Sequence, residues 1–288
     1  GEIWMIPSAF TFYKPDSIEK AVSIMKNFGD EARVIAGGHS LIPVMKQRLT
    51  DIKHLIDLSA IKELKGINIS GKSISIGAMT TQVELITNEN LFKSAPVIRE
   101  ASLQIADPQV RNLGTIGGNV ANGDPANDMP GLMQLLDATY KLSGTNGLRE
   151  VKAREFYEGA YFTAREDDEI LISISFDAPI GGYAYEKQKR KIGDYATAAA
   201  GVILNVDNGV CASASIALTN LSDTPVYCDE AVSLLTGKKI DDNLLSQVTK
   251  SCVEQSDPVA DQRGPVEFKK YVAGVVINKA LKRAFDRS

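Results

Sequence analysis

Two pairs of adjacent glycines are the residues best suited to bind a ligand in this 288-residue sequence. The first lies in Ala36-Gly37-Gly38-His39-Ser40, after an apolar run, Ala32–Ala36, that predicts a buried strand. Adjacent glycines let the backbone approach a ligand closely and adopt positive φ angles. Their N–H groups, with the start of a helix predicted from Leu41 and capped by Ser40, form a nest that suits a diphosphate. The alternative is a glycine turn that only redirects the chain.

The second pair lies in Gly114-Thr115-Ile116-Gly117-Gly118-Asn119. We expect a long polar loop here, Asp107–Pro130, interrupted by a helical stretch near Gly117–Val120. Two glycine turns can hold the two phosphates of one dinucleotide from opposite sides, and Asn122–Asp128 adds amides and carboxylates for ribose or ribityl hydroxyls. A structured surface loop is the alternative, although ordered loops of this length are usually functional. Neither pair fits Gly-x-Gly-x-x-Gly, so the glycines do not predict an NAD site.

A third match is to the Walker A pattern, Gly66-x-x-x-x-Gly71-Lys72-Ser73. That motif binds phosphate only where a helix follows it. Here Ile74–Ala78 alternates apolar and polar residues with period two and ends in small residues, which predicts a strand. We therefore interpret Gly71-Lys72 as the tip of a hairpin, and a P-loop hydrolase as a rival that a helix at residues 74–78 would favour.

The segment Tyr183–Tyr195 combines aromatic residues with four lysines and arginines. A solvated charge run is one interpretation. Another is a flavin site, in which an aromatic ring packs on the flavin and a lysine contacts its electron-rich edge. The chain carries a net charge of −4, which gives no reason to expect a nucleic acid or a membrane surface as partner.

Composition limits the remaining classes of function. Three widely spaced cysteines and two histidines predict neither a disulfide framework nor a metal site. No apolar run is long enough to span a bilayer, and we expect a cytoplasmic protein with reduced thiols. Gly1–Trp4 looks like a leader or cloning remnant and is left out of the fold prediction.

The length of the chain predicts two domains. The first covers residues 5–180 and opens with alternating strands and helices that form a small α/β unit (5–58); a hairpin signature follows at residues 66–80. Pro179-Ile180-Gly181-Gly182 marks the boundary. Residues 181–288 are predicted to form strands at Ala198–Val206 and Ala212–Thr219, followed by amphipathic helices that end in a basic one.

These motifs, in this order, resemble the FAD-binding subunits of the xanthine dehydrogenase and molybdenum hydroxylase family. The resemblance extends from Met5 to the end of the chain. Longer strings are most similar to the medium subunits of the aerobic carbon monoxide dehydrogenases in that family; they are Ala36–Met45, Ile105–Pro130, Gly159–Ala164 and Tyr183–Ala200. His39 departs from the Gln or Asn of many relatives, but it is still a polar hydrogen-bonding residue.

The resemblance implies FAD bound without a covalent link, and a role for each matching residue. The diphosphate would be held by Ile35, Ala36, Gly37, Gly38, His39, Ser40 and Leu41, and by Thr115, Ile116, Gly117, Gly118 and Asn119. Ile105 would line the pocket, and Asp128 would hydrogen-bond the FAD. Leu171 and Lys187 would lie against it, with Tyr195 over the isoalloxazine ring. No residue of this chain is expected to act as a catalytic acid or base, or to ligate a metal.

The family also implies partners and a fold. A large subunit would carry the molybdenum cofactor and a small subunit two [2Fe–2S] clusters, assembled as a dimer of heterotrimers that is cytoplasmic or associated with the inner face of the membrane. FAD would pass electrons from the clusters to a quinone or cytochrome. The fold would be α+β, with an FAD-binding domain (5–180) made of a small α/β subdomain (5–58) and an antiparallel-sheet subdomain (59–180). The C-terminal domain (181–288) would pair an antiparallel sheet with a helix bundle. The rivals are a flavin subunit for an aldehyde, N-heterocycle or acyl thioester, a stand-alone FAD oxidoreductase, and a scaffold whose glycines are structural.

Overall fold

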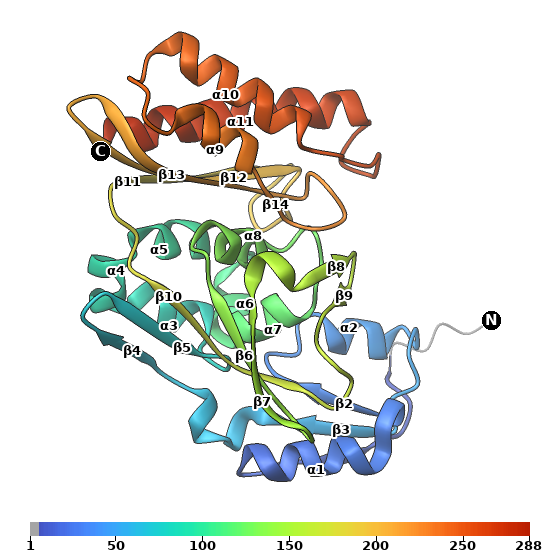
Figure 1. Cartoon of the computed structure of the whole chain (residues 1–288). Coiled ribbons are helices and arrows are strands. Elements are labelled where there is room, and N and C mark those ends of the chain that lie inside the picture. Colours follow the sequence, from blue (N-terminus) through green and yellow to red (C-terminus); the bar gives the residue numbers. More distant parts are fainter. Residues whose placement is uncertain (1–5) are drawn as a thin grey trace.

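The computed structural model describes residues 6–288, so Gly1–Trp4 and the expected first domain residue, Met5, lie outside the described part. The chain forms three stacked units (Figure 1): a small α/β unit, a central unit with a five-stranded sheet, and a C-terminal sheet covered by helices. This arrangement confirms the predicted α+β class. In residues 6–288, no helix is both long and apolar enough to cross a membrane.

The small unit is a parallel three-stranded sheet of order β1-β3-β2. Its elements are β1 (Thr11–Tyr13), α1 (Ile18–Phe28), β2 (Ala32–Ile35), α2 (Leu41–Lys46) and β3 (His54–Asp57), with 3-10 turns at Gly29–Glu31, Leu58–Ala60 and Lys62–Leu64. Helix α1 forms because its apolar residues recur on one face, and the Ser17 side chain caps its start. Its buried face packs on the sheet in a core that also includes Met79 and Ile170 of the central unit.

The central unit contains an antiparallel sheet of order β4-β5-β10-β6-β7. Its strands are β4 (Ile67–Ser70), β5 (Ser73–Gly77), β6 (Thr139–Gly144), β7 (Gly147–Lys152), β8 (Tyr157–Gly159), β9 (Phe162–Thr163) and β10 (Ile170–Asp177), and a 3-10 turn covers Ala153–Glu155. Its helices are α3 (Gln82–Thr87), α4 (Glu89–Ser94), α5 (Pro96–Ser102), α6 (Pro108–Leu113), α7 (Ile116–Ala121) and α8 (Asp128–Leu135). The hairpin predicted at the Walker-like sequence is confirmed, because β4 and β5 pair antiparallel on either side of Gly71. The chain therefore has no P-loop there.

The segment predicted as a long loop with a helical stretch near Gly117–Val120, residues 107–130, is mostly helical: α7 confirms that stretch, whereas α6 and the start of α8 were not predicted. Asp107 caps α6 at the N–H of Val110, and Thr115 caps α7 at the N–H of Gly118. The helices are too short and too rich in glycine and asparagine to show an amphipathic period in the sequence. Packing against the rest of the unit stabilises them, because isolated helices of this length are marginal.

The C-terminal unit is an antiparallel sheet with helices on its outer face (Figure 1). Its elements are β11 (Gly182–Gln188), β12 (Ala198–Asp207), β13 (Val210–Thr219), β14 (Val226–Tyr227), α9 (Asp229–Leu235), α10 (Asp242–Glu254) and α11 (Val266–Asp286). The first seven residues of β12 are buried on both faces. Ala199 and Ile203 belong to the central core, whereas Ala200 and Val202 belong to the core beneath α9–α11. The sheet therefore joins the helical layer to the central unit.

Candidate functional site

A cavity of about 680 Å³ lies between the small and central units and reaches the segment after β11. Its volume falls within the ~300–1,000 Å³ typical of cofactor pockets. The predicted site residues that line it are Ile35, Ala36, Gly37, Gly38, His39, Ser40, Leu41, Ile105, Thr115, Gly117, Gly118, Asn119, Asp128, Leu171, Lys187 and Tyr195. Segments up to 160 residues apart in the sequence (Ile35 to Tyr195) thus meet at one site.

Ile116 is the predicted site residue that does not line this cavity. Its side chain is fully buried in the central core. Its N–H donates to the carbonyl of Thr80 at 2.9 Å. As the first residue of α7, it faces away from the cavity that its neighbours line.

The two glycine turns touch each other. A Cβ on Gly37 would lie 2.3 Å from the carbonyl oxygen of Leu113, immediately before the second motif. A Cβ on Gly118 would lie 3.5 Å from the Cβ of Ala36 in the first motif. Gly38 has a φ of +76°, which glycine adopts without strain. The pairs are therefore required where the small unit meets the central unit, at the wall of the cavity.

The first turn offers consecutive free backbone donors. The N–H groups of residues 37–40 donate to no other residue within 6–288, whereas the N–H of Ile42 bonds the carbonyl of Gly38 at 2.9 Å. Ser40 occupies the N-cap position, but its side chain makes no cap bond, contrary to expectation. The first turn thus presents consecutive donors to an anion.

The second turn uses the N–H groups of residues 116–119 within the protein and leaves that of Thr115 without a partner among residues 6–288, so it does not form the second nest of consecutive donors that we expected. The N–H of Gly117 bonds the carbonyl of Ala78 at 2.8 Å, and the N–H of Gly118 bonds Thr115 Oγ1 at 3.0 Å. The N–H of Asn119 bonds the Thr115 carbonyl. Because its glycines lack Cβ atoms, the second turn lies close to Ala78 and to the first turn. The side-chain groups that it offers to a ligand are mainly the Thr115 hydroxyl and the Asn119 amide.

A buried ion pair forms the wall farthest from the small unit. Lys187 Nζ lies 2.7 Å from Asp128 Oδ2, and their side chains are 1% and 4% exposed. Tyr185 Oη donates to Asp128 Oδ1 at 2.6 Å. Burial, and then the Asp128 carboxylate, raise the pKa of the Tyr185 phenol, so this residue stays a neutral donor. The solvated interpretation of residues 183–195 is therefore wrong for β11 and applies only to the exposed turn after it.

Two tyrosines stand at the cavity mouth. Tyr195 is 43% exposed, and burial together with the charge of Asp124 raises its pKa. Tyr161 is 63% exposed; burial of part of its ring, and Asp124, raise its pKa to about 12. Both phenols are neutral at physiological pH, so each offers an aromatic face and a hydroxyl rather than a base.

Several cavity residues were not predicted from the sequence, among them Gln82 and Arg165. Gln82 is 2% exposed, and neither polar atom of its side chain has a partner in the described part of the chain. Arg165 lies in the segment between β9 and β10. Neither residue belongs to a motif, so local sequence contains no signal for them.

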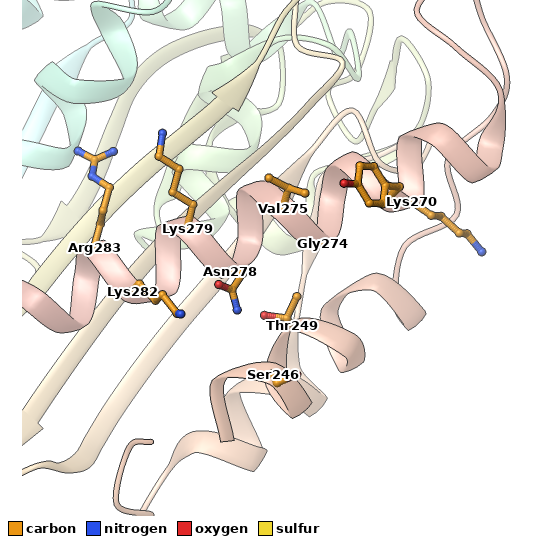
Figure 2. A pocket seen from close by; sticks show the side chains of 10 residues that line it. Ser246, Thr249, Lys270, Gly274, Val275, Asn278, Lys279, Lys282 and Arg283 are labelled. Carbon is orange, nitrogen blue, oxygen red and sulfur yellow. The ribbon is translucent and has the colours of Figure 1, made fainter. Parts of the chain in front are cut away.

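A second hollow, about 720 Å³ in volume, lies between α10 and α11 (Figure 2). Its charged side chains point in different directions: Lys279 and Arg283 project to one side of α11, and Lys270 and Lys282 do not converge with them. Within residues 6–288 no cluster of three or more His, Cys, Asp or Glu side chains is placed to hold a metal. The cavity between the small and central units is therefore the candidate site.

Comparison with known proteins identifies the family. Residues 8–178 match the FAD-binding domain in molybdopterin dehydrogenases, and residues 183–284 match the CO dehydrogenase flavoprotein C-terminal domain. The chain belongs to the molybdopterin dehydrogenase FAD-binding family. It is 50% identical to the carbon monoxide dehydrogenase medium chain of Afipia carboxidovorans and 39% identical to that of Hydrogenophaga pseudoflava, covering 98–99% of this chain and 99% of each relative. The structure of cyanide-inactivated Cu,Mo-CO dehydrogenase superposes with a TM-score of 0.96 over 98% of this chain and 100% of that one, at 50% identity.

The cavity fits the FAD of this family. Free N–H groups at residues 37–40 suit a diphosphate, and the absence of a side chain at Gly37 lets the two turns pack together at the cavity wall. The unpartnered amide of Gln82 and the exposed aromatic face of Tyr195 are groups that a polar, ring-bearing ligand satisfies. FAD, when bound, supplies one- and two-electron transfer, and the residues around it bind, orient and shield it.

Proposed function

We propose that this chain is the FAD-carrying medium subunit of a molybdenum-containing carbon monoxide dehydrogenase. The observation that carries the proposal is the full-length 50% identity to a carbon monoxide dehydrogenase medium chain, combined with a cavity at the matched glycine turns. In this proposal the first turn holds the diphosphate, and Tyr195 covers the isoalloxazine ring. Asp128 and Lys187 contact the flavin end, with Ile105 and Leu171 against the cofactor.

The proposed partners are a large molybdenum-cofactor subunit and a small [2Fe–2S] subunit, in a dimer of heterotrimers. Electrons would leave FAD for a quinone or cytochrome. We place the complex in the cytoplasm, which suits three buried free cysteines. The proposed domains are 5–180, divided at 58/59, and 181–288; the two family matches, 8–178 and 183–284, support the main boundary.

The test is an absorption spectrum with cofactor extraction, on the purified native complex and on this chain alone, followed by anaerobic addition of substrate. FAD in the complex, and bleaching of its absorbance by carbon monoxide but not by an aldehyde or N-heterocycle, is the expected result. Bleaching by an aldehyde or N-heterocycle instead would support the assignment as a flavin subunit but exclude carbon monoxide as the substrate of the complex. A folded complex without flavin, even after FAD is added, would reject the proposal and leave the glycine turns structural.

A further inference from the structure

Arg165 lines the cavity from the segment between β9 and β10, which runs toward β2 at the small-unit side of the molecule (Figure 1). Arg33, on β2, also lines the cavity and lies near enough to act on the charge of Arg165. Asp128 and Lys187 come from other elements: helix α8, which packs on the C-terminal sheet, and β11, which belongs to that sheet.

Half of the Arg165 guanidinium is bonded within its own segment. Nη1 donates to the carbonyls of Glu166 at 2.7 Å, Glu169 at 3.0 Å and Asp167 at 3.5 Å. Nε and Nη2 donate to no residue among 6–288, although the guanidinium lines the cavity. Three N–H donors are therefore available to a ligand.

Arg165 also lacks a direct ion-pair partner. It forms no ion pair with any carboxylate in the described chain, although Asp167, Glu169 and Asp168 lie near enough to act on its charge. Asp168 accepts hydrogen bonds from Thr145, and Glu169 accepts two from Arg149, at 2.5 and 2.7 Å. Burial, and then the neighbouring charge of Arg33, lower the pKa of Arg165. Two neighbouring cations, of which Arg165 has no direct ion pair in the described chain, favour an anionic ligand at this side of the cavity.

We propose that Arg165 is a further FAD-binding residue, which donates to the phosphate on the adenosine side of the diphosphate, with Arg33 adding positive charge beside it. The assignment rests on the proposed function, which places the flavin ring at Tyr195 and Lys187 and so directs the adenosine half toward β2. The diphosphate is the anionic part of oxidised FAD, and a guanidinium fork matches phosphate geometry. The free N–H groups of residues 37–40 and the Arg165 donors would then bind the diphosphate from two sides.

The experiment measures FAD release from the native complex after dilution, followed by the fluorescence of free FAD. The variants are Arg165→Gln and Arg165→Lys, and the control is Arg154→Gln. Arg154 likewise bonds a carbonyl, that of Gln134 at 3.1 Å, but does not line the cavity. We expect Arg165→Gln to release FAD about 10- to 100-fold faster, because hydrogen bonds to charged groups contribute that much. Arg165→Lys should release FAD at a rate between those of Arg165→Gln and the unmodified protein, and Arg154→Gln should release it at the unmodified rate.

Phosphorus NMR of the bound FAD distinguishes a direct contact between Arg165 and FAD from a role in which Arg165 only stabilises its own segment. A contact predicts that Arg165→Gln shifts the adenosine-side resonance and leaves the flavin-side resonance in place. Unchanged release, or faster release with both resonances unmoved or moved equally, would overturn the proposal and limit Arg165 to bracing its segment. A wild-type complex that contains no flavin would reject the proposed function itself, and this proposal with it.

Discussion

Replacing Lys187 with methionine should strongly destabilise the FAD-free chain. The substitution removes the ammonium that lies 2.7 Å from Asp128 and leaves a carboxylate that is 4% exposed. Only the 2.6 Å bond from Tyr185 would remain to it. Removing one partner of a buried pair costs about 3–5 kcal/mol, since the remaining charge stays out of water without compensation. That is a large part of the ~5–15 kcal/mol that stabilises a typical domain.

The assay is urea unfolding of FAD-free chain, so that lost ligand binding does not contribute to the difference. The double variant Lys187→Met/Asp128→Asn should recover most of the loss, because it removes the second charge as well. Lys250→Met is the matched control: its ion pair with Glu254 is largely exposed, at 79% and 65%, and should contribute little. A loss below about 1 kcal/mol for Lys187→Met, or no recovery in the double variant, would refute an uncompensated charge as the cause.

Three further predictions concern other walls of the cavity. Gly37→Ala should lower the unfolding free energy by about 1–3 kcal/mol and prevent FAD retention, because its Cβ would overlap a carbonyl oxygen. Gly274→Ala is the control and should be tolerated, because a Cβ there has ordinary contacts. An equal loss of unfolding free energy in the two variants would contradict the reasoning. Gln82→Leu should raise the unfolding free energy of FAD-free chain by about 1 kcal/mol, since it removes a buried amide without partners; a loss of stability would show that this amide is satisfied. Burial raises the pKa of Glu169, but hydrogen bonds, chiefly from Arg149, lower it more. The stabilisation is therefore present above the unfolded carboxyl pKa of 4.5 and is lost as pH falls through the folded pKa. Glu169→Gln should make the unfolding free energy depend less on pH between about pH 6 and pH 3. Urea titrations at several pH values would show this.

Local signals in the sequence sufficed where residue type alone determines the backbone. The hairpin at Gly71 follows from period-two alternation around a turn, and the structure has it there. The first glycine turn could also be located, because a glycine pair directly after a strand permits a close approach of the backbone. Its packing partner, the carbonyl of Leu113, is 76 residues away and has no local signal.

Apart from the stretch near Gly117–Val120, the helices between residues 107 and 135 could not be predicted in the same way. They depend on side-chain caps at Asp107 and Thr115, and on packing of α7 against β10 and of α8 against β12 and β13, rather than on helix propensity. The Thr115 cap also engages the N–H of Gly118, one of the donors expected to bind a ligand in the second turn. A motif identifies which residues approach a ligand, but the hydrogen-bond inventory of the folded chain decides which of their atoms are free to bind it.

That distinction also explains why Gln82 and Arg165 escaped prediction. A glutamine or an arginine is ordinary in any sequence, and each becomes informative only when its potential partners are known to be engaged elsewhere. For Arg165, the relevant fact is that Arg149 already holds Glu169, so a nearby carboxylate does not neutralise the cavity. For Gln82, it is that no described neighbour satisfies the amide. Unsatisfied donors and charges that line one cavity therefore indicate its ligand independently of the glycine motifs, and here both point to a polar, anionic dinucleotide.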